Sequence, residues 1–576
     1  MSVREGGANL RPMALARENV GQDRLHSEVH LGPRPNPAPE LSVCLAYPNT
    51  YRVGMANLGF QAIYGILVAA GVGVERAFLP DEGPRGRVRS LEGGRSLSSF
   101  DVLAFSISFE TDYVHVLDML AAAGLALRRD ERGARDPLVV AGGPATFLNP
   151  EPLADFVDLF LIGEGEEMVP EWLAALAGAP GGGEPRERWL EASATVAGAY
   201  VPGARESSPT AGSVPALVKR RYVQRLDDFP VSSRILAPEA VFGDMFLVEA
   251  SRGCEWGCRF CAAGFMYRPV RHRSTASLRE AVVHEALEHR RTVGLVGAEM
   301  ASHPGIAALC QEIADRGGRA SPSSLKADLV SPALASALAS GATRSVTIAP
   351  EAGSERLRRV INKNLTEDEI LRAAELLAAG GVGQLKLYAM IGLPTETDAD
   401  VVAIAELAAK IRARLPGAVG KITLSINPFV PKPWTPFQWE PMADRRLLRE
   451  RANLLRRAAR SIPGAKVDFE SPRDAYWQTL LSRGDRRLSW LLAQVHRSGG
   501  RFWPVVQAAV RGERPDDVPS PDWYVHRRYD PHEGLPWDFI DHQVDKRYLL
   551  AEWRKAILER ETAPCDVATC HSCGAC

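Results

Sequence analysis

Short apolar runs alternate with amphipathic segments through the first third of the chain. Apolar runs bounded by turn residues indicate buried strands, and apolar positions at helical spacing indicate the helices between them. We expect strands at residues 41–47, 102–107, 138–141 and 159–162, and helices at residues 58–70 and 113–127. This alternation favours an α/β fold with a doubly wound, mostly parallel sheet, which we assign to residues 39–180. Such sheets bind ligands at the carboxyl ends of their strands.

The same alternation returns between residues 244 and 440. The expected strands are residues 245–249, 292–296, 345–348, 384–390 and 421–426. The expected helices are residues 277–291, 304–316, 331–340, 366–379 and 398–414. Repeated strand–helix units favour a partial or full β/α barrel, in which the chemistry takes place at the carboxyl ends of the strands.

The other segments lack this alternation. Residues 1–38 are polar and rich in arginine, and we expect a flexible tail there. Residues 181–243 are rich first in Gly and Pro and then in Arg, which predicts a linker with short strands. Residues 441–562 have mainly helical periodicity, and residues 563–576 form a Cys-rich tail. The chain therefore divides into two α/β units and a mostly helical C-terminal region.

The 576 residues are 45% hydrophobic and carry a formal net charge of -1, as in ordinary globular proteins. This charge gives no general attraction to nucleic acid, so we interpret the basic runs at 219–221 and 482–487 as solvated faces. The alternatives are contact with a phosphate for the first run, and with a phosphate-bearing or nucleic-acid substrate such as RNA for the second. No stretch reaches the roughly 18 apolar residues of a membrane span, and residues 1–37 lack a secretory signal. Seven of nine cysteines lie in two tight clusters, as metal ligands do in a reducing compartment, so we expect a cytoplasmic protein.

The first cluster consists of Cys254, Cys258 and Cys261, spaced C-x3-C-x2-C directly after an expected strand. Thiolates at this spacing suit an iron–sulfur cluster. Because a cubane has four irons, three cysteines leave one iron open to an outside ligand. The alternative is a zinc site or an inert thiol cluster, but structural zinc is normally held by four protein ligands.

The second cluster closes the sequence. Its four cysteines, at C-x4-C-x2-C-x2-C spacing, are Cys565, Cys570, Cys573 and Cys576. Four thiolates can hold either a tetrahedral zinc ion or a second [4Fe-4S] cluster. The sequence leaves both alternatives open.

The first cluster, with Phe260 directly before its third cysteine, resembles the signature of the radical S-adenosylmethionine (SAM) superfamily. The resemblance implies a [4Fe-4S] cluster whose open iron binds SAM. An electron from the cluster then cleaves SAM to methionine and a 5′-deoxyadenosyl radical, which abstracts hydrogen from a substrate. It also implies an electron donor, either a reductase or a flavodoxin- or ferredoxin-type protein.

Motifs at later strand ends strengthen this resemblance. By position they correspond to parts of the family that contact SAM, and their residues here are Phe260, Glu299, Glu351, Ser354, Gly392 and Pro394. For Glu299 the alternative is a surface glutamate at the start of the next helix. The sequence assigns no catalytic residue.

The loops at the strand ends of residues 39–175 resemble those of cobalamin-binding domains that precede many radical SAM cores. The resemblance implies cobalamin contacts for Ser106, Gly142, Gly143 and Gly163. The chain departs from the pattern because it lacks the Asp-x-His-x-x-Gly loop that places a histidine under cobalt. A domain kept for packing or substrate docking is the alternative.

We therefore expect an enzyme that cleaves SAM reductively and modifies an unknown substrate. If cobalamin binds, radical methylation of an unactivated carbon is the favoured outcome. One alternative is a methylthiotransferase-like modification of RNA or protein, although that family carries its extra cysteines in the N-terminal domain, where this chain has only Cys44. Another is a non-catalytic iron–sulfur or zinc scaffold.

Overall fold

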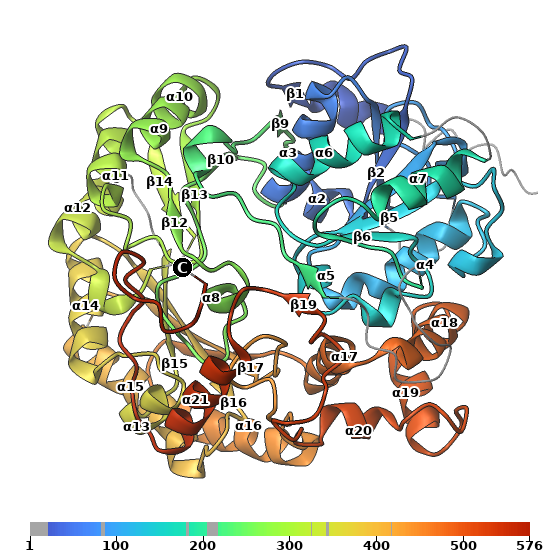
Figure 1. Ribbon diagram of the computed structural model, residues 1–576. Coiled ribbons are helices and arrows are strands. Elements are labelled where there is room, and N and C mark those ends of the chain that lie inside the picture. Colours follow the sequence, from blue (N-terminus) through green and yellow to red (C-terminus); the bar gives the residue numbers. More distant parts are fainter. Residues whose placement is uncertain are drawn as a thin grey trace, which may run out of the picture.

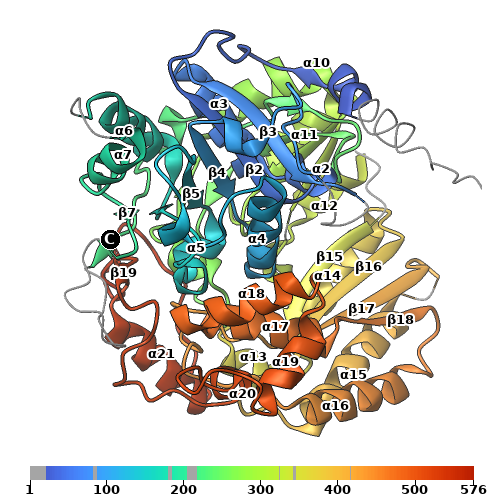
Figure 2. The ribbon, with the colours of Figure 1, turned by 90° about the vertical axis from the view of Figure 1, so that its right-hand side faces the viewer.

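A computed structural model describes residues 21–81, 87–179, 184–203, 217–323, 325–340, 345–415 and 417–575. Two α/β units lie side by side, the N-terminal unit in blue to teal and the core in green to yellow (Figure 1). The C-terminal helices, in orange and red, pack against both units (Figures 1 and 2). The expected α/β architecture is confirmed.

The N-terminal sheet has six strands in the order β3-β2-β4-β5-β6-β7. All neighbours are parallel except β6 and β7. The strands are β2 (Ser42–Thr50), β3 (Gly73–Leu79), β4 (Val102–Ser106), β5 (Leu138–Gly142), β6 (Leu159–Leu161) and β7 (Ala199–Tyr200). The middle of β2 is buried on both faces, as in parallel sheets covered by helices. The expected strands β2, β4, β5 and β6 are present, whereas β3 and β7 were not predicted.

Helices cover both faces of this sheet (Figure 2). They are α2 (Tyr51–Gly54), α3 (Leu58–Ala69), α4 (Tyr113–Ala122), α5 (Pro144–Leu148), α6 (Gly165–Ala177) and α7 (Pro185–Ser193). Asn57 caps α3, because its side chain accepts a hydrogen bond from the Phe60 N–H at 2.8 Å. The two predicted helices correspond to α3 and α4.

The described part of the expected N-terminal tail is built into the fold. Strand β1 (Val29–His30) pairs with β9 (Ile235–Leu236), and the buried Glu28 carboxylate lies 2.7 Å from the Arg76 guanidinium. The expectation of a flexible tail therefore does not hold for these residues, and residues 1–20 lie outside the described ranges. In the expected linker, β8 (Val218–Lys219) pairs with β19 (Ile540–Asp541).

The core contains seven parallel strands in two neighbouring sheets, β10-β13-β14 and β15-β16-β17-β18. They are β10 (Met245–Glu249), β13 (Thr292–Val296), β14 (Arg319–Pro322), β15 (Ser345–Glu351), β16 (Gln384–Ile391), β17 (Lys421–Pro428) and β18 (Ala465–Phe469). A parallel bridge between Leu325 and Ile348 connects the two sheets, so together they form a partial barrel. The five expected strands are confirmed, and β14 and β18 were not predicted.

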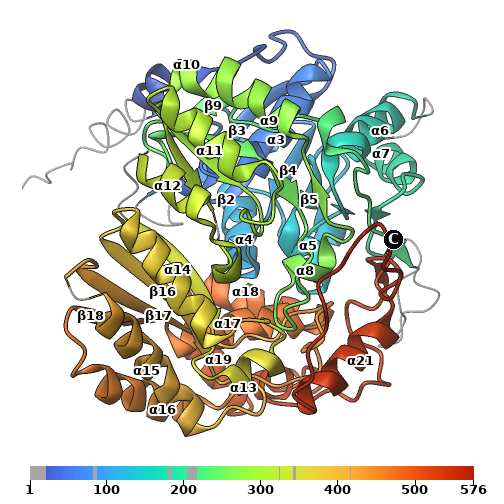
Figure 3. The ribbon, with the colours of Figure 1, turned by 90° about the vertical axis from the view of Figure 1, so that its left-hand side faces the viewer.

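The core helices follow the strands in the expected order (Figure 3). They are α9 (Thr275–Glu280), α10 (Leu287–His289), α11 (Ile306–Asp315), α12 (Pro332–Ser340), α13 (Glu355–Val360), α14 (Glu367–Ala379), α15 (Asp398–Arg414) and α16 (Arg445–Ala459). A π-helical turn, Ala281–Ala286, joins α9 to α10. Because β18 pairs with β17, the barrel sheet continues beyond the expected boundary at residue 440. The helix–strand unit α16–β18 therefore belongs to the core and not to the C-terminal region expected from the sequence.

Short elements follow β10: β11 (Ser251–Arg252), α8 (Ala263–Met266) and β12 (Arg271–His272). The C-terminal helices are α17 (Pro472–Arg483), α18 (Ser489–Arg497), α19 (Phe502–Val510), α20 (Pro521–Val525) and α21 (Lys546–Ile557). Helix α18 packs against α4, where the His496 ring lies 2.6 Å from the Asp118 carboxylate (Figure 2). Among the described helices, none has the length and apolar character needed to cross a membrane.

Candidate iron–sulfur and cofactor site

The cysteine loop, residues 253–261, begins where β11 ends. Gly253 adopts φ +79°, and a Cβ there would lie 2.6 Å from the Tyr267 carbonyl oxygen. Only glycine fits both the backbone conformation and the close approach. The glycine thus lets the chain turn from the first core strand into the cysteines.

The loop brings the three predicted thiols into electrostatic contact with one another. Burial raises the pKa of Cys258 to about 11, and burial together with the two neighbouring thiols raises the pKa of Cys254. Within the described ranges, no three Cys, His, Asp or Glu side chains surround a point where one metal ion could bind. A cubane binds each thiolate through a different iron, so its ligands need not meet at one point. The donor set of three soft thiolates fits such a cluster.

Two lysines that the sequence analysis missed flank the loop. The Lys363 ammonium lies 3.6 Å from the Glu351 carboxylate. Although burial acts to lower it, Glu351 and the three thiols raise the pKa of Lys363. Lys326 is buried, and its ammonium lies 3.7 Å from the centre of the Trp256 ring between Cys254 and Cys258. Both cations offset negative charge at the cysteines, but no motif in the sequence marks either one.

Glu299 is buried rather than exposed, so the interpretation as a surface glutamate is wrong. Its carboxylate accepts hydrogen bonds from the N–H groups of Ala301 at 2.7 Å, Ser302 at 2.8 Å and Lys326 at 3.2 Å. These bonds fix the turn after β13 beside the cysteine loop. Contact between Glu299 and the SAM amino group stays a prediction.

The other predicted SAM contacts gather around one apolar cluster. Phe260 packs there with Ala352, next to Glu351, and with Leu393, between Gly392 and Pro394. Ser354 caps α13, because its hydroxyl accepts from the Leu357 N–H at 3.1 Å.

The turn after β16 is also held by the protein itself. The Gly392 N–H donates to Glu396 at 2.6 Å, and Arg451 binds the same carboxylate at 2.6 Å. Ser354 and Gly392 thus each have a structural role within the protein, as a helix cap and in a turn. Their contacts with SAM stay predictions.

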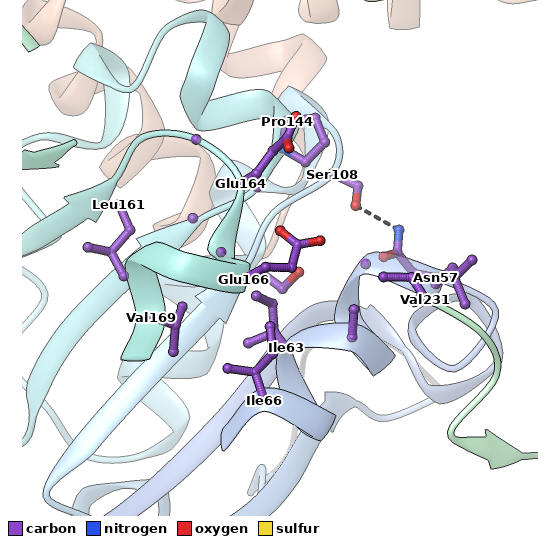
Figure 4. A pocket seen from close by; sticks show the side chains of 18 of the residues that line it. Asn57, Ile63, Ile66, Ser108, Pro144, Leu161, Glu164, Glu166, Val169 and Val231 are labelled. Atoms are coloured by element: carbon purple, nitrogen blue, oxygen red, sulfur yellow. Dashed lines mark hydrogen bonds between the residues drawn. The ribbon is translucent and has the colours of Figure 1, made fainter. Parts of the chain in front are cut away.

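All four predicted cobalamin contacts line one cavity of about 430 Å³ between the two α/β units. Figure 4 shows Ile63 and Ile66 of α3, Leu161 of β6 and Val169 of α6 around it. The cavity extends across the carboxyl ends of β4, β5 and β6 to residues 251–253 and 296–298 of the core. It therefore adjoins the start of the cysteine loop.

At two of the cavity glycines, backbone conformation and close packing explain why the residue is glycine. Gly143 and Gly163 have φ values of +107° and +132°. An added Cβ would lie 2.5 Å from the Ile107 carbonyl oxygen or 2.3 Å from the Arg221 carbonyl oxygen. Backbone packing alone requires these two glycines, whereas Gly142 has room for a Cβ, with the nearest atom at 3.5 Å.

Charged side chains connect this cavity with the cysteine loop. Arg252, directly before Gly253, binds the carboxylates of Glu164 at 2.9 Å and Glu249 at 2.7 Å, and also that of Glu166. Arg271 adds two bonds to Glu164, at 2.7 and 2.9 Å. Because Glu164 and Glu166 line the cavity, its wall is tied to the residue that precedes the loop. Single arginines and glutamates carry no sequence signal for such a network.

The second cysteine cluster lies against the core. Cys573 is buried at 1% exposure, and Cys565 and Cys570 are half-buried. A hydrogen bond from Ser572 and contact with Cys565 lower the pKa of Cys570. The fourth predicted ligand, Cys576, lies outside the described residues.

Comparison with known proteins identifies the family. The family model described as the radical SAM superfamily matches residues 248–408, and one described as the N-terminal part of radical SAM proteins matches residues 59–202. The uncharacterized protein MJ0966 of Methanocaldococcus jannaschii is 30% identical over 457 residues, which cover 78% of this chain and 90% of that protein.

Two solved structures are similar at low identity. The radical SAM methyltransferase TsrM of Kitasatospora setae, with tryptophan and a SAM analogue bound, is 14% identical with a TM-score of 0.47. That match covers 67% of this chain and 73% of TsrM. The cobalamin-dependent radical enzyme OxsB is 14% identical with a TM-score of 0.43, covering 64% of this chain and 52% of OxsB.

The match of the core, the extended similarity to MJ0966 and the three cysteines at the first core strand lead to one conclusion. The chain belongs to the radical SAM superfamily and is an enzyme that uses a [4Fe-4S] cluster to cleave SAM.

Proposed function

We propose that the protein binds cobalamin in the cavity between its two α/β units and methylates an unactivated carbon of its substrate. The observation that carries this proposal is the position of the cavity. It joins the carboxyl ends of the N-terminal strands, where parallel sheets bind ligands, to the first two strands of the radical SAM core. A cofactor there would face the same space as SAM.

The lining of the cavity fits a corrin ring, which has apolar faces and amide side arms. Ile63, Ile66 and Val169 supply apolar contact, and its volume is typical of small-molecule sites. Polar groups stand at its rim, where the Asn57 amide donates to the Ser108 hydroxyl at 3.0 Å (Figure 4). No histidine is among the described residues that line it, in keeping with the missing Asp-x-His-x-x-Gly loop.

The residues of the chain would bind and orient the two cofactors. Bound cobalamin supplies a transferable methyl group, and cleavage of SAM supplies the radical that activates the substrate carbon. The apolar wall excludes water, and Ser106 and Ser108 offer hydroxyls to the amide arms. Arg252, through Glu164 and Glu166, holds the cavity wall in register with the cysteine loop.

The test is a substitution that fills the cavity without straining the backbone. Gly142→Leu meets this requirement, because no positive φ is needed there and the nearest atom to an added Cβ is 3.5 Å away. We expect the wild type to retain hydroxocobalamin through gel filtration, as its absorbance spectrum will show. We expect Gly142→Leu to bind hydroxocobalamin at least about tenfold more weakly, which corresponds to about 1.4 kcal/mol of binding free energy.

The matched control is Gly534→Leu, at an open position outside the cavity, which should bind as the wild type does. Circular dichroism and iron content should be equal in all three proteins. A wild type that binds no cobalamin, or a Gly142→Leu protein that binds it unchanged, would refute the proposal.

We further propose a flavodoxin- or ferredoxin-type protein as the electron donor and the cytoplasm as the location. Reductive cleavage of SAM requires an electron that the chain does not itself generate. Seven of the nine cysteines lie in two tight clusters, as metal ligands do, which supports a reducing compartment.

A further inference from the structure

The C-terminal tail returns to the cysteine loop and is bonded to it. The Cys565 N–H donates to the Glu255 carbonyl at 2.8 Å, directly beside Cys254. The Asn362 side chain accepts from the Thr562 N–H at 2.7 Å and donates to the Gly257 carbonyl at 3.1 Å. One buried amide therefore holds the tail and the loop together. Figure 3 shows the red chain running from α21 back along the core.

A second buried side chain repeats this connection from within the loop. Arg259, between Cys258 and Cys261, donates to the carbonyl of Arg560 in the tail at 2.7 Å. Its guanidinium also lies 3.0 Å from the Glu552 carboxylate of α21. The tail is thus part of the wall around the first cysteine cluster.

A third side chain, this one cationic, lies between the two clusters, over the rings of Phe265 and Tyr548. Arg268 is 4% exposed and donates from Nε to the Gly264 carbonyl at 2.7 Å. A Cβ at Gly257 would lie 3.7 Å from its Nη2, and the Cys573 thiol is within hydrogen-bonding reach. Within the described ranges no carboxylate pairs with this guanidinium. A buried guanidinium favours negative charge beside it, and Cys573 is the tail residue that it reaches.

We propose that Cys565, Cys570 and Cys573 ligate a second iron–sulfur cluster, whose negative charge Arg268 balances, and that this cluster relays electrons to the first. The relay rests on the SAM-cleaving activity of the family. A flavodoxin- or ferredoxin-type donor gives one electron to the oxidised tail cluster, which then passes it to the oxidised loop cluster and returns to its starting state.

The exposure of the tail favours an electron-transfer role over a purely structural metal site. Cys573 faces Arg268 in the interior, whereas the residues between Cys565 and Cys573 are mostly exposed. One side of the cluster would therefore be open to a protein donor, and the other would adjoin the loop. Zinc has no redox chemistry, so a zinc ion at this position could not transfer electrons between a donor and the loop cluster.

The first experiment counts and identifies the metals in anaerobically reconstituted full-length protein. Two four-iron clusters give about eight irons per chain in the wild type. Replacing Cys565, Cys570 and Cys573 together by Ala should leave about four, with an electron paramagnetic resonance signal that still changes on addition of SAM. Replacing Cys254, Cys258 and Cys261 should also leave about four, without a response to SAM. Zinc in the tail, or four irons in the wild type, would overturn the proposal.

The second experiment separates the relay from SAM cleavage itself. With a flavodoxin and its reductase, the tail triple variant should form 5′-deoxyadenosine at least tenfold more slowly than the wild type. With dithionite, which reaches the loop cluster directly, the two should differ less than twofold. Equal rates with flavodoxin, or equal losses with both reductants, would overturn the relay. A wild type inactive with dithionite would instead contradict SAM cleavage.

The third experiment tests the charge between the clusters. Arg268→Gln should shift the midpoint potential of the tail cluster to more negative values, because a nearby cation stabilises the more negatively charged reduced state. Arg268→Lys keeps the charge and should lie close to the wild type. A redox titration followed by electron paramagnetic resonance measures both. An unchanged potential in Arg268→Gln, with the cluster intact, would remove Arg268 from the proposal.

Discussion

The two cysteine clusters use the same residue type but are placed in different ways. The loop cysteines follow β10 and β11 directly, and their position is set by the core sheet and by the turn at Gly253. The tail cysteines lie beyond the last helix, and hydrogen bonds through Asn362 and Arg259 hold the tail against the same loop. The loop is therefore part of the barrel, whereas the tail is docked on it.

This difference shows that spacing predicts metal ligands but not how firmly a fold presents them. The loop should keep its shape without the tail, because its strand pairing does not involve residues beyond 296. Within the described residues the tail has no strand or helix after α21. Hydrogen bonds to the loop hold it, and Cys573 and Ala575 are buried in an apolar cluster. Changes in these two regions should therefore have separable effects on chemistry and on stability.

The largest expected effect is the loss of chemistry from the loop alone. Cys258→Ala should abolish formation of 5′-deoxyadenosine with dithionite, because the cluster would lose one of three ligands. Cys570→Ala should retain it under the same conditions, since Cys570 is not a ligand of the loop cluster. Cys310→Ala, which removes a buried thiol from α11, is the matched control and should stay active. Activity in Cys258→Ala would contradict the assignment of the loop.

The next effect concerns stability. Arg259→Ala should lower the free energy of unfolding by about 3 kcal/mol, because it removes one partner of a buried ion pair and three carbonyl contacts. Lys555→Ala removes a partly exposed cation from the same Glu552 carboxylate and should cost less than about 1 kcal/mol. Urea unfolding of the metal-free proteins measures both. Equal costs would mean that Arg259 does not hold the tail to the loop.

Much of the architecture could be predicted from the sequence because periodicity reports burial. The strands β10 and β13 and the helix α15 have the predicted bounds, and a capping box at Thr397 begins α15. Strand β18 escaped prediction because its residues are only partly buried and alternate weakly. Pairing with β17 determines this strand, and sequence periodicity does not report pairing.

The candidate site also contains some residues that the sequence predicted and others that it did not. Cysteine spacing predicted the thiols, and the resemblance of the strand-end loops to cobalamin-binding domains predicted four of the residues that line the cavity. No motif marks Lys363, Asn362 or Arg268, because single polar residues become functional only when distant segments fold together. Two glycines that resembled cofactor contacts, Gly143 and Gly163, are required by backbone packing. Glycine spacing alone therefore cannot distinguish a ligand-binding loop from a place where two backbone segments of the same chain pack closely together.

The smallest expected effect is a pH dependence of stability at Glu552, which pairs with Arg259 of the loop. Although burial acts to raise it, Lys555, Arg259 and Thr562 keep the pKa of Glu552 below its usual range. A depressed pKa in the folded state adds stability above the ordinary carboxyl value of about 4.3, and that stability is lost as the pH falls below it. Glu552→Gln should therefore be less stable than the wild type by about 1–2 kcal/mol at neutral pH, with a gap that narrows toward pH ~3.

Urea unfolding of the metal-free proteins across this pH range measures the gap between Glu552→Gln and the wild type. Limited proteolysis of the tail should follow it, because Glu552 also accepts from the Thr562 hydroxyl at 2.8 and 2.9 Å. Glu559→Gln, on the exposed end of the same segment, is the control and should show a smaller change. Parallel pH profiles for Glu552→Gln and the wild type would show that the ion pair with Arg259 adds nothing to the docking of the tail.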